Sequence, residues 1–203
     1  MALAQYELAA ADLETVVELH PTSAFGFARR AKVHRRKRDF ERAWADCATA
    51  LTLDPECAEA MAVRGSIHAH FRRETDAIAD YTRSLELRPD NSEMYAGRGL
   101  AYARLKQLVR AIDDYTEAIR LSPRWAEVFE LRGRTYFRLG EWRSAIEDFT
   151  RAFEIKPDLK RALQYRGFAR EALGDYEGAP RDRLKGQGLL ADDDPTSDAS
   201  DVE

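Results

Sequence analysis

Five prolines recur at one fixed interval and strongly limit what this chain can fold into. Pro21, Pro55, Pro89, Pro123 and Pro157 each lie 34 residues after the one before. A fixed period of this length indicates repeated structural units, each of which can bury its apolar face only by stacking on its neighbours. We therefore expect a stack of repeats.

Small and aromatic residues recur with the same period and predict two amphipathic helices in each repeat. Two helices joined by a short turn approach closely only where one of them carries glycine or alanine, and bulky neighbours then fill the remaining space. Proline ends the second helix because it has no N–H to donate. One small column is Ala31, Gly65, Gly99, Gly133 and Gly167, and the other is Ala43, Ala77, Ala111, Ala145 and Ala179.

Arginine and aspartate form two further columns. Because both types recur in every repeat, we expect them to pair as part of the scaffold, in the bidentate geometry that suits arginine and carboxylate. The arginines are Arg30, Arg64, Arg98, Arg132 and Arg166, and the aspartates are Asp46, Asp80, Asp114, Asp148 and Asp182.

The composition favours an all-α protein. Ala, Leu, Arg and Glu are abundant, and no alternating run of Val, Ile and Thr predicts a strand. No apolar stretch approaches the roughly 20 residues that span a bilayer, and the first residues lack the basic head of a signal peptide. Cys47 and Cys57 form no disulfide framework, and free thiols suit a reducing compartment. We expect a soluble, cytoplasmic protein.

The period and its motifs resemble a known family. The blocks "RGLAYARLKQLVRAIDDYTEAIRLSP" (98–123) and "RGRTYFRLGEWRSAIEDFTRAFEIKP" (132–157) are similar to tetratricopeptide repeats. The resemblance implies an all-α fold, an α-solenoid or right-handed superhelix of stacked antiparallel helix pairs. It divides the chain into an N-terminal half-repeat helix (1–23), four repeats (24–57, 58–91, 92–125 and 126–159) and a degenerate C-terminal repeat (160–185). The acidic composition of residues 186–203 predicts a disordered tail.

The resemblance also implies a concave groove, lined by the first helices of successive repeats, that holds a peptide or an extended segment of a partner. Groove positions should face away from the Gly and Tyr columns at about 100° per residue. None of the five positions that match the chaperone clamp of some family members carries the clamp residue, so we do not expect such a clamp. The groove candidates are Phe25, Arg29, Lys32, Arg36, Val63, Ser66, His70, Leu100, Arg104, Leu131, Arg134, Arg138, Tyr165 and Phe168.

A basic cluster stands out at the start of the first full repeat. Seven of the ten residues from Arg29 to Arg38 are Lys or Arg, and four of them, Arg29, Lys32, Arg35 and Arg36, remain for a groove patch once the Arg column and the interhelical turn are set aside. Such a run is most often a solvated helical face. A site for an acidic peptide is the second interpretation. Nucleic acid is the third, disfavoured because the chain has a net charge of −4.

No residue pattern indicates catalysis, a metal or a cofactor. His68 and His70 are two residues apart, and a helix turns such residues to different sides. We predict a non-catalytic protein–protein interaction scaffold whose partner is a protein or peptide, with an acidic one as a candidate and no membrane. Two alternatives stay open: self-association or a structural module whose groove is filled by its own chain, and nucleic-acid binding through the Arg29–Arg38 cluster.

Overall fold

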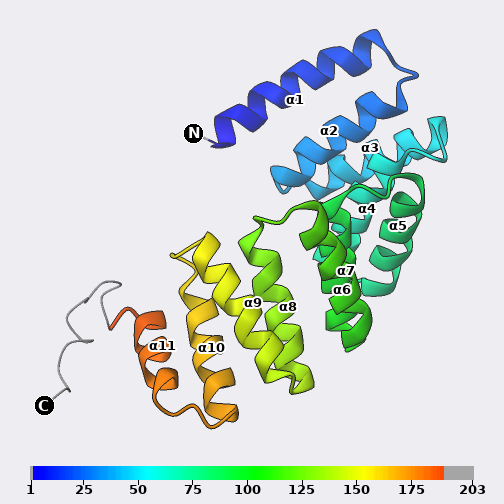
Figure 1. Ribbon diagram of the computed structural model, residues 1–203. Helices are drawn as coiled ribbons and strands as arrows, with labels where there is room; N and C mark the ends of the chain where they lie inside the picture. Colours follow the sequence, from blue (N-terminus) through cyan, green and yellow to red (C-terminus); the bar gives the residue numbers. More distant parts are fainter. Residues whose placement is uncertain (1, 190–203) are drawn as a thin grey trace, which may run out of the picture. The chain divides into compact units, whose positions relative to one another are not determined.

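The structure is a computed structural model that describes residues 2–189, with side chains from Glu7 onward. Within these residues it contains eleven α-helices and no strand (Figure 1). The helices are α1 (Ala2–Leu19), α2 (Ala24–Arg36), α3 (Phe40–Leu53), α4 (Ala58–His70), α5 (Glu74–Leu87), α6 (Ser92–Arg104), α7 (Leu108–Leu121), α8 (Ala126–Leu139), α9 (Trp142–Ile155), α10 (Lys160–Ala172) and α11 (Gly178–Gly186).

The chain divides into two compact units, Met1–Leu121 and Ser122–Glu203, which we call the N-terminal unit and the C-terminal unit. In the N-terminal unit, α2 packs with α3, α4 with α5 and α6 with α7 as antiparallel pairs, and α1 packs on α2. In the C-terminal unit, α8 pairs with α9 and α10 with α11. The fold is an all-α solenoid of helix pairs, as the sequence predicts.

The helix ends follow the capping and proline signals of the sequence. The side chain of Ser23 accepts a hydrogen bond from the Gly26 N–H at the start of α2, and Asp39 does the same for the Arg42 N–H at the start of α3. Helix α3 ends at Leu53, two residues before Pro55, and the later prolines end α5, α7 and α9 in the same way.

The two small-residue columns lie at the closest helix contacts. A Cβ added at Gly99 would lie 2.9 Å from the Tyr115 ring, and one added at Gly133 would lie 3.0 Å from the Phe149 ring. Tyr115 and Phe149 are fully buried, and so are the alanines of the second column. The sequence-based prediction of close packing at these columns is confirmed.

The predicted Arg–Asp pairing is also confirmed, in all five places. Each arginine donates from Nε and Nη2 to the two carboxylate oxygens of the aspartate sixteen residues later, on the other helix of its pair. The Nη2–Oδ1 distances are 2.6 to 2.8 Å. Arg98 and Arg166 add a third hydrogen bond, to Thr82 and Thr150 of the preceding helix, so these two ion pairs also join neighbouring helix pairs.

The C-terminal end departs from regular repeats. Helix α11 has nine residues where the second helices of the earlier pairs have fourteen. It ends at Gly186, one residue inside the range that the sequence assigns to the tail. The rest of the expected acidic tail, from residue 190, lies outside the described residues. Among residues 2–189, no helix is both long enough and apolar enough to cross a bilayer.

Candidate functional site

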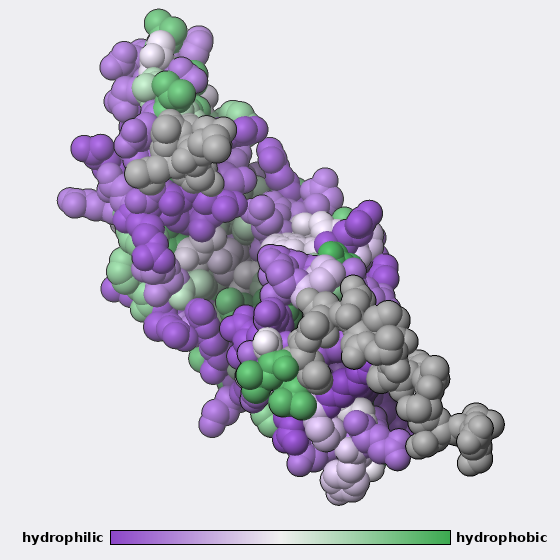
Figure 2. Space-filling view, turned by 90° about the vertical axis from the view of Figure 1, so that its left-hand side faces the viewer, coloured by the Kyte–Doolittle hydropathy of each residue, from purple (hydrophilic) through white to green (hydrophobic). Residues whose placement is uncertain are grey.

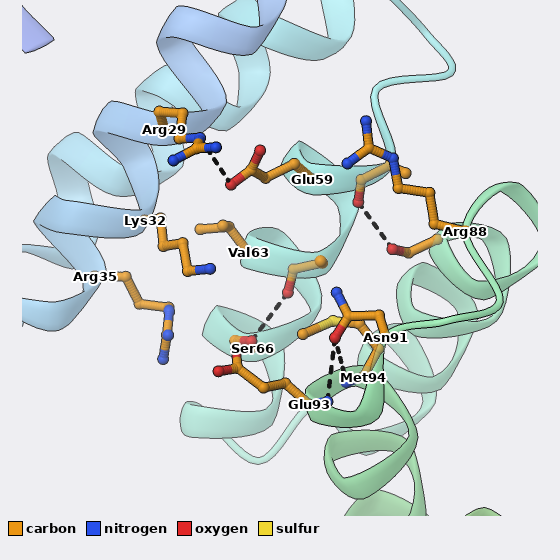
Figure 3. A pocket seen from close by; sticks show the side chains of 13 residues that line it. Arg29, Lys32, Arg35, Glu59, Val63, Ser66, Arg88, Asn91, Glu93 and Met94 are labelled. Atoms are coloured by element: carbon orange, nitrogen blue, oxygen red, sulfur yellow. Dashed lines mark hydrogen bonds and ion pairs between the residues drawn. The ribbon is translucent and has the colours of Figure 1, made fainter. Parts of the chain in front are cut away.

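The candidate site is a cavity of about 220 Å³ in the N-terminal unit, between α2, α4 and the start of α6. In Figure 3, cationic side chains from α2 lie along one side, residues of α4 form the floor, and the loop before α6 closes the opposite side. The lining residues are Arg29, Lys32, Arg35, Ala58, Glu59, Ala62, Val63, Ser66, Ser84, Arg88, Asn91, Glu93 and Met94.

Helix α2 supplies three cations because Arg29, Lys32 and Arg35 are three residues apart and share one helix face. Arg29 forms a long ion pair with Glu59, at 3.6 Å, and its guanidinium lies 4.7 Å from the centre of the Phe25 ring. Lys32 forms no hydrogen bond or ion pair with any residue that the structure describes. One of the three cations is therefore held by an acid, and Lys32 has no acidic partner among the described residues.

Arg35 combines partial burial with the lack of an ion-pair partner in the described part of the chain. Its Nε is buried without a hydrogen-bond partner, and no acid of the described residues forms an ion pair with it. Burial, and then the charge of Arg36, lower the pKa of the Arg35 guanidinium from its ordinary value. A shielded cation that lacks a partner carries a desolvation cost that an incoming anion would offset.

The floor of the cavity is apolar, and its hydroxyl groups are already engaged. Val63 of the floor and Met94 of the opposite wall are both buried. The Ser66 hydroxyl donates to the Ala62 carbonyl at 2.9 Å and accepts a hydrogen bond from the Tyr81 hydroxyl at 3.2 Å. Burial raises the pKa of Tyr81, which keeps this phenol neutral. The site thus combines an apolar floor with a cationic wall, which suits a side chain that has methylene groups and a negative end.

Several predicted groove residues lie outside this cavity but in the same unit. Phe25 and Arg36 flank it, and Arg36 approaches Glu93 at 3.9 Å. His70 stacks on Phe40 with 4.2 Å between ring centres. Arg104 binds Glu74 at 3.2 Å, and half-buried Leu100 does not line the cavity.

The remaining groove candidates belong to the C-terminal unit. The Arg134 guanidinium lies 5.4 Å from the Tyr165 ring centre and 3.8 Å from the carboxylate of buried Glu130. Phe168 is exposed beneath the Arg183 guanidinium. Leu131 is half-buried, and Arg138 is exposed.

The basic cluster predicted from Arg29 to Arg38 is divided by the fold. Arg30 turns inward to Asp46, whereas Arg29, Lys32 and Arg35 line the cavity. Lys37 and Arg38 belong to the turn before α3. Arg36 lies outside the cavity and approaches Glu93. The cluster is therefore divided into four sets of cations, which does not favour one continuous nucleic-acid surface.

Sequence reasoning missed the far wall of the cavity. Ser84, Arg88, Asn91 and Met94 come from the end of α5, the following loop and α6, whereas the sequence criterion considered only one face of the first helices. Asn91 carried a usable signal, because asparagine before a helix often accepts hydrogen bonds from its first N–H groups. It does so here from Glu93 and Met94.

This fold of antiparallel helix pairs is that of an α-solenoid interaction scaffold. Sequence models of the tetratricopeptide repeat match residues 28–92, 75–124 and 126–159. The chain belongs to the tetratricopeptide repeat family. No curated protein sequence matches it significantly.

Solved structures agree with this family. A crystal structure of MamA is 28% identical, covers 78% of this chain and 92% of its own, and has a TM-score of 0.72. YrrB, described as a TPR protein with an unusual peptide-binding site, is 20% identical, with coverage of 89% and 94% and a TM-score of 0.77. PilF of Pseudomonas aeruginosa is 19% identical, with coverage of 93% and 86% and a TM-score of 0.79. The last two show the fold alone.

Proposed function

We propose that the protein is a non-catalytic scaffold whose N-terminal unit binds an extended segment of a partner protein, with one acidic side chain of that segment in the cavity between α2, α4 and α6. We also propose that the repeats have the boundaries that the sequence predicts. We further propose a cytoplasmic location, with which the two buried free cysteines agree.

The observation that carries the proposal is the half-buried Arg35, whose Nε is buried without a hydrogen-bond partner and which forms no ion pair with the described residues. A carboxylate that enters the cavity would accept hydrogen bonds from Arg35 and Lys32, while its methylene groups contact Val63 and Met94. Glu59 and Glu93 line the same cavity and hold Arg29 and Arg36 at 3.6 and 3.9 Å. These distances are too long for strong hydrogen bonds, so both acids would compete only weakly with a ligand.

A peptide ligand also agrees with one structural neighbour, YrrB. YrrB is described as having a peptide-binding site. For this chain the partner class rests on the cavity itself, because an extended backbone can run along the first helices while a single side chain fills about 220 Å³.

The test is selection of a phage-displayed library of random twelve-residue peptides on the full chain, followed by Kd measurement for synthetic versions of the selected peptides. We expect one position to be enriched in Glu or Asp. Arg35→Gln should weaken binding about 10- to 100-fold, because a charge-assisted hydrogen bond contributes about 1.5–3 kcal/mol. The matched control is Arg36→Gln, which removes the same charge from the next residue, outside the cavity.

Two results would contradict the proposal. One is selection without an acidic position. The other is an equal loss of affinity in Arg35→Gln and Arg36→Gln, which would mean that only the general charge of α2 matters. Light scattering of the free chain tests the alternative in which a second copy fills the groove.

A further inference from the structure

The turns between the two helices of each pair share one backbone geometry. The central residue is left-handed in every case, with φ of 62° at Arg38, 60° at Arg72, 61° at Lys106, 80° at Gly140 and 83° at Gly174. In each turn its N–H donates to the carbonyl three residues earlier, as Arg38 does to Arg35 and Gly140 to Phe137. The same turn geometry thus occurs five times. Its left-handed position holds glycine in the C-terminal unit and a cation in the N-terminal unit.

The fold does not explain these three cations. A residue with a Cβ is strained at positive φ, whereas glycine is not, and glycine occupies the same position at Gly140 and Gly174. Strain that persists where a relaxed residue would fit is a reason to look for a function. Arg38, Arg72 and Lys106 are also all exposed.

The three cationic turns lie side by side along one edge of the N-terminal unit. Phe40, directly after the first turn, lies 5.4 Å from Phe71 of the second turn, measured between ring centres. The Arg104 guanidinium, directly before the third turn, donates at 3.0 Å to the Ala69 carbonyl, in the last turn of α4 before the second. These contacts make the turns one continuous surface.

We call this surface the turn edge and define it by five cations, none of which pairs with an acid among the described residues. The nearby Asp39 is occupied, because it accepts a hydrogen bond from the Arg42 backbone N–H and approaches the Arg42 guanidinium at 3.5 Å. A row of unpaired cations creates a positive potential that attracts an anionic partner. The turn-edge cations are Lys37, Arg38, Arg72, Arg73 and Lys106.

An apolar cleft opens within the turn edge. It has a volume of about 520 Å³ and shares no lining residue with the cavity near Arg35. Phe71 is 56% exposed and Trp44 is 41% exposed, although both are large aromatic residues. An exposed aromatic patch on a soluble surface often marks an interaction site. The cleft is lined by Phe40, Glu41, Trp44, Ile67, His68, Phe71 and Arg73.

The geometry points to a second binding surface, the turn edge, for an acidic protein segment that inserts one leucine or aromatic side chain into this cleft. A protein segment is favoured over a nucleic acid, because two rings of the cleft already pack on histidines: Phe40 stacks on His70, and Trp44 contacts His68 at 5.2 Å. It is favoured over a membrane because the apolar residues form a recess. The acidic character follows from the unpaired cations around the recess.

The decisive variant replaces the three strained cations by glycine: Arg38→Gly with Arg72→Gly and Lys106→Gly. Glycine relaxes each turn, so the melting temperature should stay the same or rise, and lost binding cannot be attributed to unfolding. The matched control, Arg38→Lys with Arg72→Lys, keeps both the charge and the strained backbone, and should keep binding. A third variant, Trp44→Ser with Phe71→Ser, removes the apolar lining of the cleft.

The probe is a phage-displayed library of random sixteen-residue peptides, selected on the wild-type chain and counter-selected on the triple-glycine chain. We expect peptides rich in Asp and Glu with one Leu, Phe or Trp. Their affinity should fall at least tenfold in the triple-glycine and Trp44→Ser/Phe71→Ser chains, and also between 0.05 and 0.5 M salt. Arg35→Gln should leave them unaffected, so failure of this surface and failure of the groove proposal can be told apart.

The inference is overturned if selection yields no peptide that distinguishes the wild-type from the triple-glycine chain. It is also overturned if the selected peptides bind both chains equally. Single-stranded DNA of twenty nucleotides and phosphatidylserine vesicles are measured in parallel. Tighter binding of either one than of the selected peptides, lost in the triple-glycine chain, would refute the assigned partner.

Discussion

Replacing Arg98 by leucine would remove one half of a buried ion pair and leave the other half in place. Arg98 donates from Nε and Nη2 to the Asp114 carboxylate at 2.9 and 2.8 Å, and from Nη1 to the Thr82 hydroxyl at 3.1 Å. Asp114 is only 5% exposed, so water cannot replace the lost donors. The variant would therefore hold an uncompensated carboxylate between α6 and α7.

The expected loss in the free energy of unfolding is about 3–5 kcal/mol at pH 7, the usual cost of breaking a buried pair from one side. The double variant, Arg98→Leu with Asp114→Leu, removes both charges and should lie within about 1–2 kcal/mol of the wild type. Arg120→Leu is the control. It breaks an exposed pair with Glu117 of the same 2.8 Å length and should cost less than about 1 kcal/mol.

The pH dependence provides an independent check on the same variant. Burial raises the pKa of Asp114 above its ordinary value, and the hydrogen bonds and charge of Arg98 oppose that rise. Without Arg98 the pKa should rise further. A carboxyl whose pKa is higher in the folded state favours folding when it is protonated, so the variant should recover stability relative to the wild type as the pH falls from 7 to 5.

Urea unfolding followed by circular dichroism measures these differences, with the midpoint compared at pH 7 and pH 5. The reasoning is refuted if Arg98→Leu costs no more than Arg120→Leu, or if the double variant is as unstable as the single one. Either result would mean that the repeated pairs do not stabilise the helix pairs in the way that their geometry suggests.

Three further predictions concern packing and titration. Gly133→Leu should lower stability by about 1–3 kcal/mol because its Cβ alone would meet the Phe149 ring at 3.0 Å; an unchanged melting curve would contradict close packing. Burial lowers the pKa of His34, so its contribution to stability is full above the unfolded pKa and is lost as the pH falls; His34→Tyr should flatten the loss in melting temperature between pH 7.5 and 5.5. Burial raises the pKa of Cys47 to about 12, so Ellman's reagent at pH 8 should modify this thiol only after unfolding, and fast modification of the native chain would count against its burial.

The scaffold could be predicted from the sequence because every helix pair solves the same packing problem. The spacing of Pro55, the glycine at Gly99 and the pairing of Arg98 with Asp114 each recur with the period, and each recurs in the structure in the same role. The division after Leu121 could not be predicted, because the period runs through that point without interruption.

The site was only partly predictable. A helical period identifies which side chains share one face of a helix. Four residues of the face predicted in this way line the cavity: Arg29, Lys32, Val63 and Ser66. Met94 and the loop residues beside it reach the cavity through the packing of α6 on α5, and no local sequence pattern encodes that approach. His70, on the same predicted face, does not line the cavity and stacks on Phe40 instead.

Departures from the repeat therefore carry more functional information than the repeat itself. A side chain that the stack requires has to appear in every unit, because every unit presents the same interface. At the position of Arg35, the next two units have Ala69 and Ala103. The stack forms without a charge there, yet Arg35 is held partly buried without an ion-pair partner that the structure describes, at a free-energy cost that an anionic ligand would offset. Arg38 is a second departure from what the scaffold needs. Glycine relaxes this turn, as at Gly140, yet the first turn carries a strained arginine.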